Sequence, residues 1–198
     1  NQDGAGAQGF SQADATTIAG TGITVTVNTA AGTGTGAAVV SNLTDAGTLT
    51  IKTNNTANDA GGSITRTATS TLGATTAVNL TTGTGDIGAA GTEINLAAGQ
   101  TGVVATTHGA GRIYLRDTGS LTLGAITTAG GLVDIATTGV GTLTAGGAIA
   151  TSGGNVTLNS QDALAVNGGI TAGAGTVGLL ANQDGAGAQG FSQADATT

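Results

Sequence analysis

The sequence predicts an all-β protein in which the chain winds as one continuous β-solenoid with coils of about 20–23 residues. Three observations support this fold class. Large aliphatic residues recur at nearly constant spacing, they alternate with small or polar residues inside short segments, and Thr, Gly and Ala supply 114 of the 198 residues. A repeat of about 20 residues is typical of proteins whose structural units stack on one another.

Residues 153–182 contain one complete coil. An alternating segment with Val156 and Leu158 is followed by a turn, a second segment around Leu164 and a single apolar position at Ile170. A Gly-rich turn then leads to Val177, where the first segment begins again. The chain is therefore expected to close one turn of a solenoid here.

The same spacing predicts columns of stacked side chains from residue 111 onward. Because side chains alternate across a strand, the apolar columns should face inward, and Tyr114, Asp134, Thr157 and Gly178 should face outward. The expected inward columns are Ile113, Val133, Val156 and Val177; Leu115, Ile135, Leu158 and Leu179; Leu121, Leu143 and Leu164; and Ile126, Ile149 and Ile170.

The first half predicts a looser version of the same fold. Residues 1–17 are polar and small apart from Phe10, so a turn or irregular passage is expected there. The alternating segments predicted as strands are residues 22–28, 39–40, 47–53, 62–67, 77–81 and 92–96, with loops at 32–36 and 54–62. Because these segments are less regular, the first half is expected to have looser coils or a different cross-section.

The segment at residues 1–17 recurs without change at residues 182–198. We interpret residues 1–198 as a single solenoid segment, residues 1–181 as one tandem repeat unit, and residues 182–198 as the start of the next copy. Coils of about 21 residues would give about eight or nine coils per unit. One coil alone buries too little apolar surface to offset its ordering entropy, so stability must come from stacking.

Composition and charge exclude several classes. Disorder is unfavourable because aliphatic residues are regularly placed and charge is low, and collagen is excluded because Pro is absent. A net charge of −7 with only four basic residues argues against nucleic-acid binding. The absence of Cys excludes a disulfide scaffold, and no apolar run reaches the length of about 18 residues that a membrane span needs.

The residues of three segments resemble those of a known family. These are GSLTLGAITTAGG at 119–131, GGNVTLNS at 153–160 and GAGTVGLLAN at 173–182. They are similar to coils of filamentous-haemagglutinin-like bacterial surface adhesins. The resemblance covers residues 83–182 well and residues 1–80 more loosely. It implies a right-handed parallel β-helix, export to the cell surface, and a role in adhesion, biofilm or sheath structure.

The sequence predicts no catalytic, cofactor-binding or metal-binding residue. His108 has no Ser or Asp arrangement beside it, so it is expected to lie in a surface loop. Asp117 is expected to form a solvent-exposed turn pair with Arg116. GTGDIG at residues 83–88 faintly resembles a calcium-binding Gly-Asp repeat, but it has no second copy.

Three functions follow as hypotheses. The first is a structural or adhesive module of a long extracellular fibre, without catalysis, that stacks end to end with copies of itself and contacts cell-surface or matrix polysaccharide. The second is an ice- or surface-binding solenoid that uses Thr-x-Thr pairs. The third is a carbohydrate-active β-helix enzyme, which the scarcity of aromatic and charged residues disfavours. The Thr pairs are Thr24 and Thr26, Thr48 and Thr50, Thr65 and Thr67, and Thr142 and Thr144.

Overall fold

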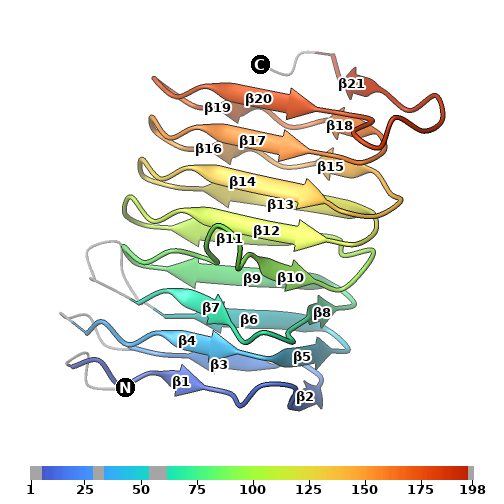
Figure 1. Ribbon diagram of the computed structural model, residues 1–198. Coiled ribbons are helices and arrows are strands. Elements are labelled where there is room, and N and C mark those ends of the chain that lie inside the picture. The colour runs from blue at the N-terminus through green and yellow to red at the C-terminus, as the bar shows by residue number, and fades with distance from the viewer. Residues whose placement is uncertain (1–5, 29–33, 54–61, 196–198) are drawn as a thin grey trace.

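A computed structural model describes residues 6–28, 34–53 and 62–195. These residues form an all-β solenoid of about seven turns, without a helix, in which every ladder between strands is parallel. Figure 1 shows the coils stacked as a rod, with the first strands at one end and the last at the other. The predicted fold class is therefore confirmed.

Two long sheets form opposite sides of the rod, which we call face A and face B (Figure 1). Face A joins a three-stranded and an eight-stranded sheet, and face B is a ten-stranded sheet in which eight strands form one row and two short strands lie beside them. The strands of face A are β1 (Phe10–Ser11), β2 (Thr17–Gly20), β4 (Ala38–Val40), β5 (Asn42–Asp45), β7 (Ile64–Arg66), β8 (Leu72–Ala74), β10 (Ile94–Leu96), β12 (Ile113–Asp117), β14 (Val133–Thr137), β17 (Val156–Asn159) and β20 (Val177–Leu180). Those of face B are β3 (Thr24–Thr26), β6 (Thr48–Lys52), β9 (Ala77–Thr82), β11 (Val103–Thr107), β13 (Leu121–Thr127), β15 (Leu143–Ala145), β16 (Ile149–Ala150), β18 (Leu164–Val166), β19 (Ile170–Thr171) and β21 (Phe191–Gln193).

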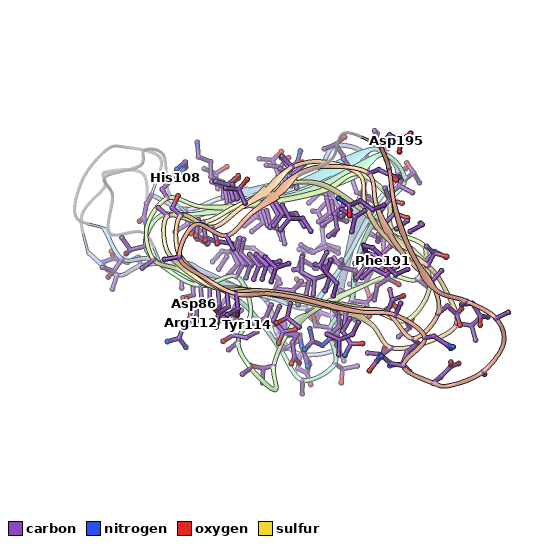
Figure 2. All side chains as sticks on the ribbon, turned by 90° about the horizontal axis from the view of Figure 1, so that it is seen from above. Asp86, His108, Arg112, Tyr114, Phe191 and Asp195 are labelled. Atoms are coloured by element: carbon purple, nitrogen blue, oxygen red, sulfur yellow. The ribbon has the colours of Figure 1, made fainter. Side chains whose placement is uncertain are left out.

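The strand registers confirm all four predicted columns. On face A, Ile113 pairs with Val133, then Val156, then Val177, and the Leu115 column follows beside it. On face B, the Leu121 and Ile126 columns continue through β15 and β18 and through β16 and β19. Most of these side chains are buried, and Figure 2 shows them stacked inside the coils.

The first half has wider coils than the second. In successive coils the first inward position of face A is occupied by Phe10, Ala38, Ile64, Ile87 and Ile113. Each of these steps along the chain is at least as long as any step of the later coils, the longest of which is β14 to β17. The described chain therefore completes about seven turns, whereas coils of uniform length predicted eight or nine for the repeat unit.

The predicted strands of the first half are present, but others were missed. Strands β2, β5, β8 and β11 had no prediction, because each is short or carries too few large aliphatic residues to alternate clearly. Residues 1–17 contain β1 and the start of β2 in addition to turns. The loop predicted at 54–62 lies almost entirely outside the described residues, as does part of the loop at 32–36.

A buried Thr and a Gly hold the corner where the chain leaves face B. In five coils the Thr hydroxyl donates to the Gly carbonyl: for example, Thr128 Oγ1 lies 2.5 Å from Gly131 O and Thr107 Oγ1 lies 2.8 Å from Gly111 O. These glycines also stack on one another, so that a Cβ on Gly131 would lie 1.9 Å from Gly111 O. The Thr–Gly corner consists of Thr53 and Gly62, Thr82 and Gly85, Thr107 and Gly111, Thr128 and Gly131, and Thr151 and Gly154.

Carboxylates cap the corner between face A and face B. Asp45 accepts the N–H groups of Gly22, Ile23 and Gly47, at 2.9 Å and 2.6 Å for the two glycines. Asp117 accepts the N–H of Gly119 at 2.7 Å in a later coil. Tight turns leave backbone donors that need acceptors, and these side chains supply them.

Candidate functional site

The charged side chains that contact one another lie on the outer surface of face A. Arg116 projects from β12, and its guanidinium lies between two carboxylates. Its Nη2 is 3.3 Å from Glu93 Oε1 and its Nη1 is 3.0 Å from Asp134 Oδ1. Arg66, on β7, donates from Nε to the main-chain oxygen of Glu93. We call these four residues, Arg66, Glu93, Arg116 and Asp134, the face A cluster.

In the face A cluster the Glu93 carboxylate is held in its ionised form. Burial alone would raise the pKa of the Glu93 carboxyl, but several groups hold that pKa below its ordinary value. They are the N–H groups of Glu93 itself and of Gly91, followed by the positive charges of Arg116 and Arg66. A carboxylate that stays ionised cannot serve as a general acid near neutral pH. The ion pairs of Arg116 with Glu93 and with Asp134 connect its coil to the coil before it and the coil after it.

A groove of about 210 Å³ lies beside Arg116. It is lined by Thr71, Asn95, Leu96, Ala97, Ala98, Arg116, Thr118 and Thr138. Hydroxyl, amide and guanidinium groups of this kind can hydrogen-bond the hydroxyl groups of a sugar. The lining contains no Asp or Glu, so it lacks the pair of carboxylates that glycoside hydrolysis normally requires. The groove is thus suited to contact and not to that reaction.

Asp117 does not form the predicted exposed pair with Arg116. Successive residues of a strand point to opposite sides, so Arg116 faces outward while Asp117 is turned inward and is only 1% exposed. Burial raises the pKa of the Asp117 carboxyl, although the N–H groups of Gly119 and Gln100 act in the opposite direction. Asp117 is aligned with Thr137 in the ladder and belongs to the corner.

Tyr114 occupies the outward position that the sequence predicts, between Ile113 and Leu115, and pairs in register with Asp134. Its side chain is nevertheless only 6% exposed. The chain that leads into β10 loops out beside it (Figures 1 and 2). Gly88 packs directly on the Tyr114 main chain. This aromatic ring is therefore not an open platform for a sugar.

His108 and Asp86 lie at separate structural positions (Figure 2). His108 directly follows Thr107 at the Thr–Gly corner, where its N–H bonds to Gly83 O at 2.9 Å. The Asp86 carboxylate accepts the Arg112 N–H at 2.7 Å. Within residues 6–28, 34–53 and 62–195, no three His, Cys, Asp or Glu side chains come together as a potential metal site. The GTGDIG segment thus contributes a bond between coils.

Face B carries one outward column rich in threonine. Its stacked positions are Thr26, Lys52, Thr81, Thr106, Thr127, Ala150 and Thr171. The next outward positions toward the start of each strand are Thr24, Thr50, Asn79, Val104, Ala125, Ala148 and Gly169, which form no Thr column. The Thr-x-Thr pairs seen in the sequence do not stack together either, since Thr65 lies on face A. The threonines of face B therefore form one row along the rod and not a two-dimensional array.

The Thr–Gly corner was missed by sequence reasoning, although a signal is present. Thr followed closely by Gly recurs at Thr82, Thr107, Thr128 and Thr151. These Thr residues repeat at about the same spacings as the aliphatic columns. In a chain with 40 Thr and 38 Gly residues, the pattern becomes visible only once the columns are aligned.

Comparison with known proteins found no match among protein-family models, curated proteins or solved structures. In the part of the chain that the structure describes, there is no helix of the length and apolar character needed to cross a membrane.

Proposed function

We propose that this chain is a structural and adhesive module of a long, repetitive extracellular fibre on a bacterial surface, and that it carries out no catalysis. One observation supports this most strongly: the inward columns run from the first coils to the last, so each coil is held by its neighbours. In such a quasi-one-dimensional protein, length can grow by adding units without changing the core.

The two ends of the solenoid support self-association by stacking. Val177, Leu179 and Phe191 belong to inward columns but are 45%, 38% and 49% exposed at the last coil. Ile18 is 39% exposed at the first coil. Open sheet edges with apolar rows favour further strand pairing. A following copy of the same sequence would cover these residues and extend the rod.

Electron microscopy of a protein with several joined copies tests this proposal. We expect unbranched rods whose length increases in proportion to copy number, with layer lines at about 4.8 Å from the spacing of adjacent strands. Compact particles whose longest dimension does not grow with copy number would contradict a fibre module.

Adhesion requires a partner, and polysaccharide is the class that suits the groove beside Arg116. Binding to bacterial and host polysaccharides can be measured by glycan array with the wild-type chain and an Asn95→Ala, Thr118→Ala variant. We expect wild-type binding to weaken in the variant. Equal binding by both proteins would place the contact elsewhere, and no binding by either would leave the fibre without an adhesive role in this module.

The Thr column on face B is the specific observation behind the alternative of ice or surface binding. Ice recognition by a solenoid would need a regular two-dimensional array, whereas the neighbouring column contains Asn, Val, Ala and Gly. We therefore expect no thermal hysteresis at millimolar protein. Hysteresis that is abolished by Thr106→Lys would instead favour the alternative.

A further inference from the structure

The duplicated segment occupies two different sheets in this structure. Residues 182–198 repeat residues 1–17, so Phe191 corresponds to Phe10. Strand β1 of the first copy lies on face A, where Phe10 pairs with Ala38. Strand β21 of the second copy lies on face B, where Phe191 pairs with Leu164 (Figure 1). One sequence therefore pairs with strands on opposite sides of the rod.

The first copy pairs with the coil that follows it. The N–H groups of Phe10 and Gln12 donate to Ala37 O and Val39 O, both at 2.9 Å. These bonds use one set of backbone groups of the strand.

The second copy pairs with the coil that precedes it, through other backbone groups. Gly190 O accepts from the Leu164 N–H at 3.0 Å, and the Ala194 N–H donates to Val166 O at 2.9 Å. Because alternate residues of a strand direct their backbone groups to opposite neighbours, one strand can make both sets of bonds at once.

The chain length between strands favours face B for a second copy. The segment from Val177 to Phe191 is shorter than every full turn of the face A column, the shortest of which runs from Ile113 to Val133. The segment from Leu164 to Phe191, in contrast, is as long as a wide turn of the first half. The chain therefore has too few residues after β20 to cross face B and return to face A before Phe191.

The next strand of a second copy also fits face B. Two inward columns of face B pass through Leu164 and Ile170. The chain from Phe10 to Ile18 is slightly longer than the chain from Leu164 to Ile170. The residue equivalent to Ile18 can thus cover Ile170 while Phe191 covers Leu164. The strand equivalent to β3 would then reach face A above β20.

We propose that successive copies of this sequence join with a half-turn offset, so that one unit, residues 1–181, makes a whole number of turns plus one half and face A of one copy continues as face B of the next. This inference rests on the proposed function, in which copies follow one another. Its consequence is that the face A cluster and its groove lie on opposite sides of the fibre in alternate copies. Such a fibre would expose the groove beside Arg116 on both of its sides.

Disulfide cross-linking in a two-copy protein tests the offset. The protein consists of residues 1–181 followed by residues 1–198, and the chain has no native Cys. With numbering continued from the first copy into the second, Ser192 is the residue equivalent to Ser11 in the second copy. In the half-turn arrangement it lies beside Ala165 of the first copy, so Ala165→Cys with Ser192→Cys should form a disulfide. Neighbouring strands lie about 4.8 Å apart, within the Cα separation that a disulfide spans. Both side chains lie outside the core columns, so the substitutions should be tolerated.

The matched control places the second cysteine on face A. If copies joined in phase, Phe191 would cover Val177, and Ser192 would lie beside Gly178. Gly178→Cys with Ser192→Cys should therefore stay reduced, and a Cβ at Gly178 meets nothing closer than 3.9 Å. Near-complete oxidation of the first pair and little of the second is the expected result. The reverse result, or oxidation of neither pair, would overturn the half-turn offset.

Electron microscopy of the same two-copy protein separates the two proposals. Rods twice the length of one copy, in which only the Gly178 pair oxidises, would keep the fibre and reject the offset. Particles that do not lengthen would reject the fibre itself, whichever pair had oxidised.

Discussion

The stacked glycines of the Thr–Gly corner bring successive turns closer than any side chain allows. A Cβ on Gly131 would meet Gly111 O at 1.9 Å, and the obstacle is backbone, which cannot rotate away. We expect Gly131→Ala to destabilise the protein by about 3 kcal/mol, the upper range for overpacking. Gly178→Ala, with no contact below 3.9 Å, is the control. Chemical denaturation measures both, and equal stabilities would show that the corner tolerates a side chain.

Two adjacent threonines with opposite orientations allow a second matched test. Thr128 is 1% exposed and its hydroxyl donates to Gly131 O, whereas Thr127 is exposed on the outer surface. Thr128→Val leaves a buried carbonyl without this donor, which costs about 1–3 kcal/mol. Thr127→Val should change the free energy of unfolding by less than about 0.5 kcal/mol. Thermal or urea unfolding that shows the same loss for both variants would contradict a structural role for the buried hydroxyl.

The two capping carboxylates should respond to pH with opposite signs. Burial alone would raise the pKa of Asp45, but the N–H groups of Gly22, Ile23 and Gly47 hold it below the ordinary value of 3.8. Its ionised form therefore stabilises the folded state above that value, and the contribution is lost as pH falls through the lower folded pKa. We expect Asp45→Asn to destabilise the protein at neutral pH and to have much less effect in strong acid, below the folded pKa.

Asp117 should behave in the reverse way. Burial raises the pKa of this carboxyl, so its ionised form is disfavoured in the folded state at neutral pH. The folded protein gains stability as pH falls from the raised folded pKa toward the unfolded value. Asp117→Asn should therefore compare most favourably with wild type at neutral pH and become relatively less stable as pH decreases. Parallel pH dependences for the Asp45 and Asp117 variants, measured by urea unfolding, would contradict this assignment.

At the scale of the strand and coil, the regular spacing of large aliphatic residues made the second half predictable. The Ile113 column is β-branched throughout, lies at the same place in each coil and stacks as expected. The first half was less predictable because its columns use Ala38 and a single residue, Ile87, where later coils have full strands. The contacts between charged side chains were harder to predict than the strands. Arg116 pairs with Glu93 and Asp134, which are distant in sequence, and only the coil register brings them together.

A whole coil should be removable when the columns stay in phase. Deleting residues 133–155 connects Leu132 to Val156, so β17 takes the place of β14 on β12. Because stability in solenoids is nearly a sum over neighbouring units, we expect a folded β protein with modestly lower stability. Deleting residues 133–143 instead moves a face B segment onto face A and should abolish cooperative unfolding. Circular dichroism and thermal melts distinguish the two, and similar melts would contradict coil modularity.

At the scale of the whole molecule, the duplicated segment was visible in the sequence, but its change of face was not. The sequence alone shows that residue 182 begins the same segment as residue 1. Whether the chain between them makes a whole number of turns depends on coil widths, which vary along the rod and are known only from the registers. The groove beside Arg116 likewise requires residues from separate coils.

The direction of the ladder hydrogen bonds has a mechanical consequence. They run from coil to coil, along the rod, so tension applied at its two ends loads a few bonds at a time instead of shearing a whole sheet. A released coil, such as that from Val133 to Val156, can extend to about 75 Å, against about 4.8 Å when stacked. Force spectroscopy should then record small, successive lengthening steps of one coil. Such a tether would absorb sudden pulls by releasing chain and shorten again as coils rewind; rupture in one large step would contradict it.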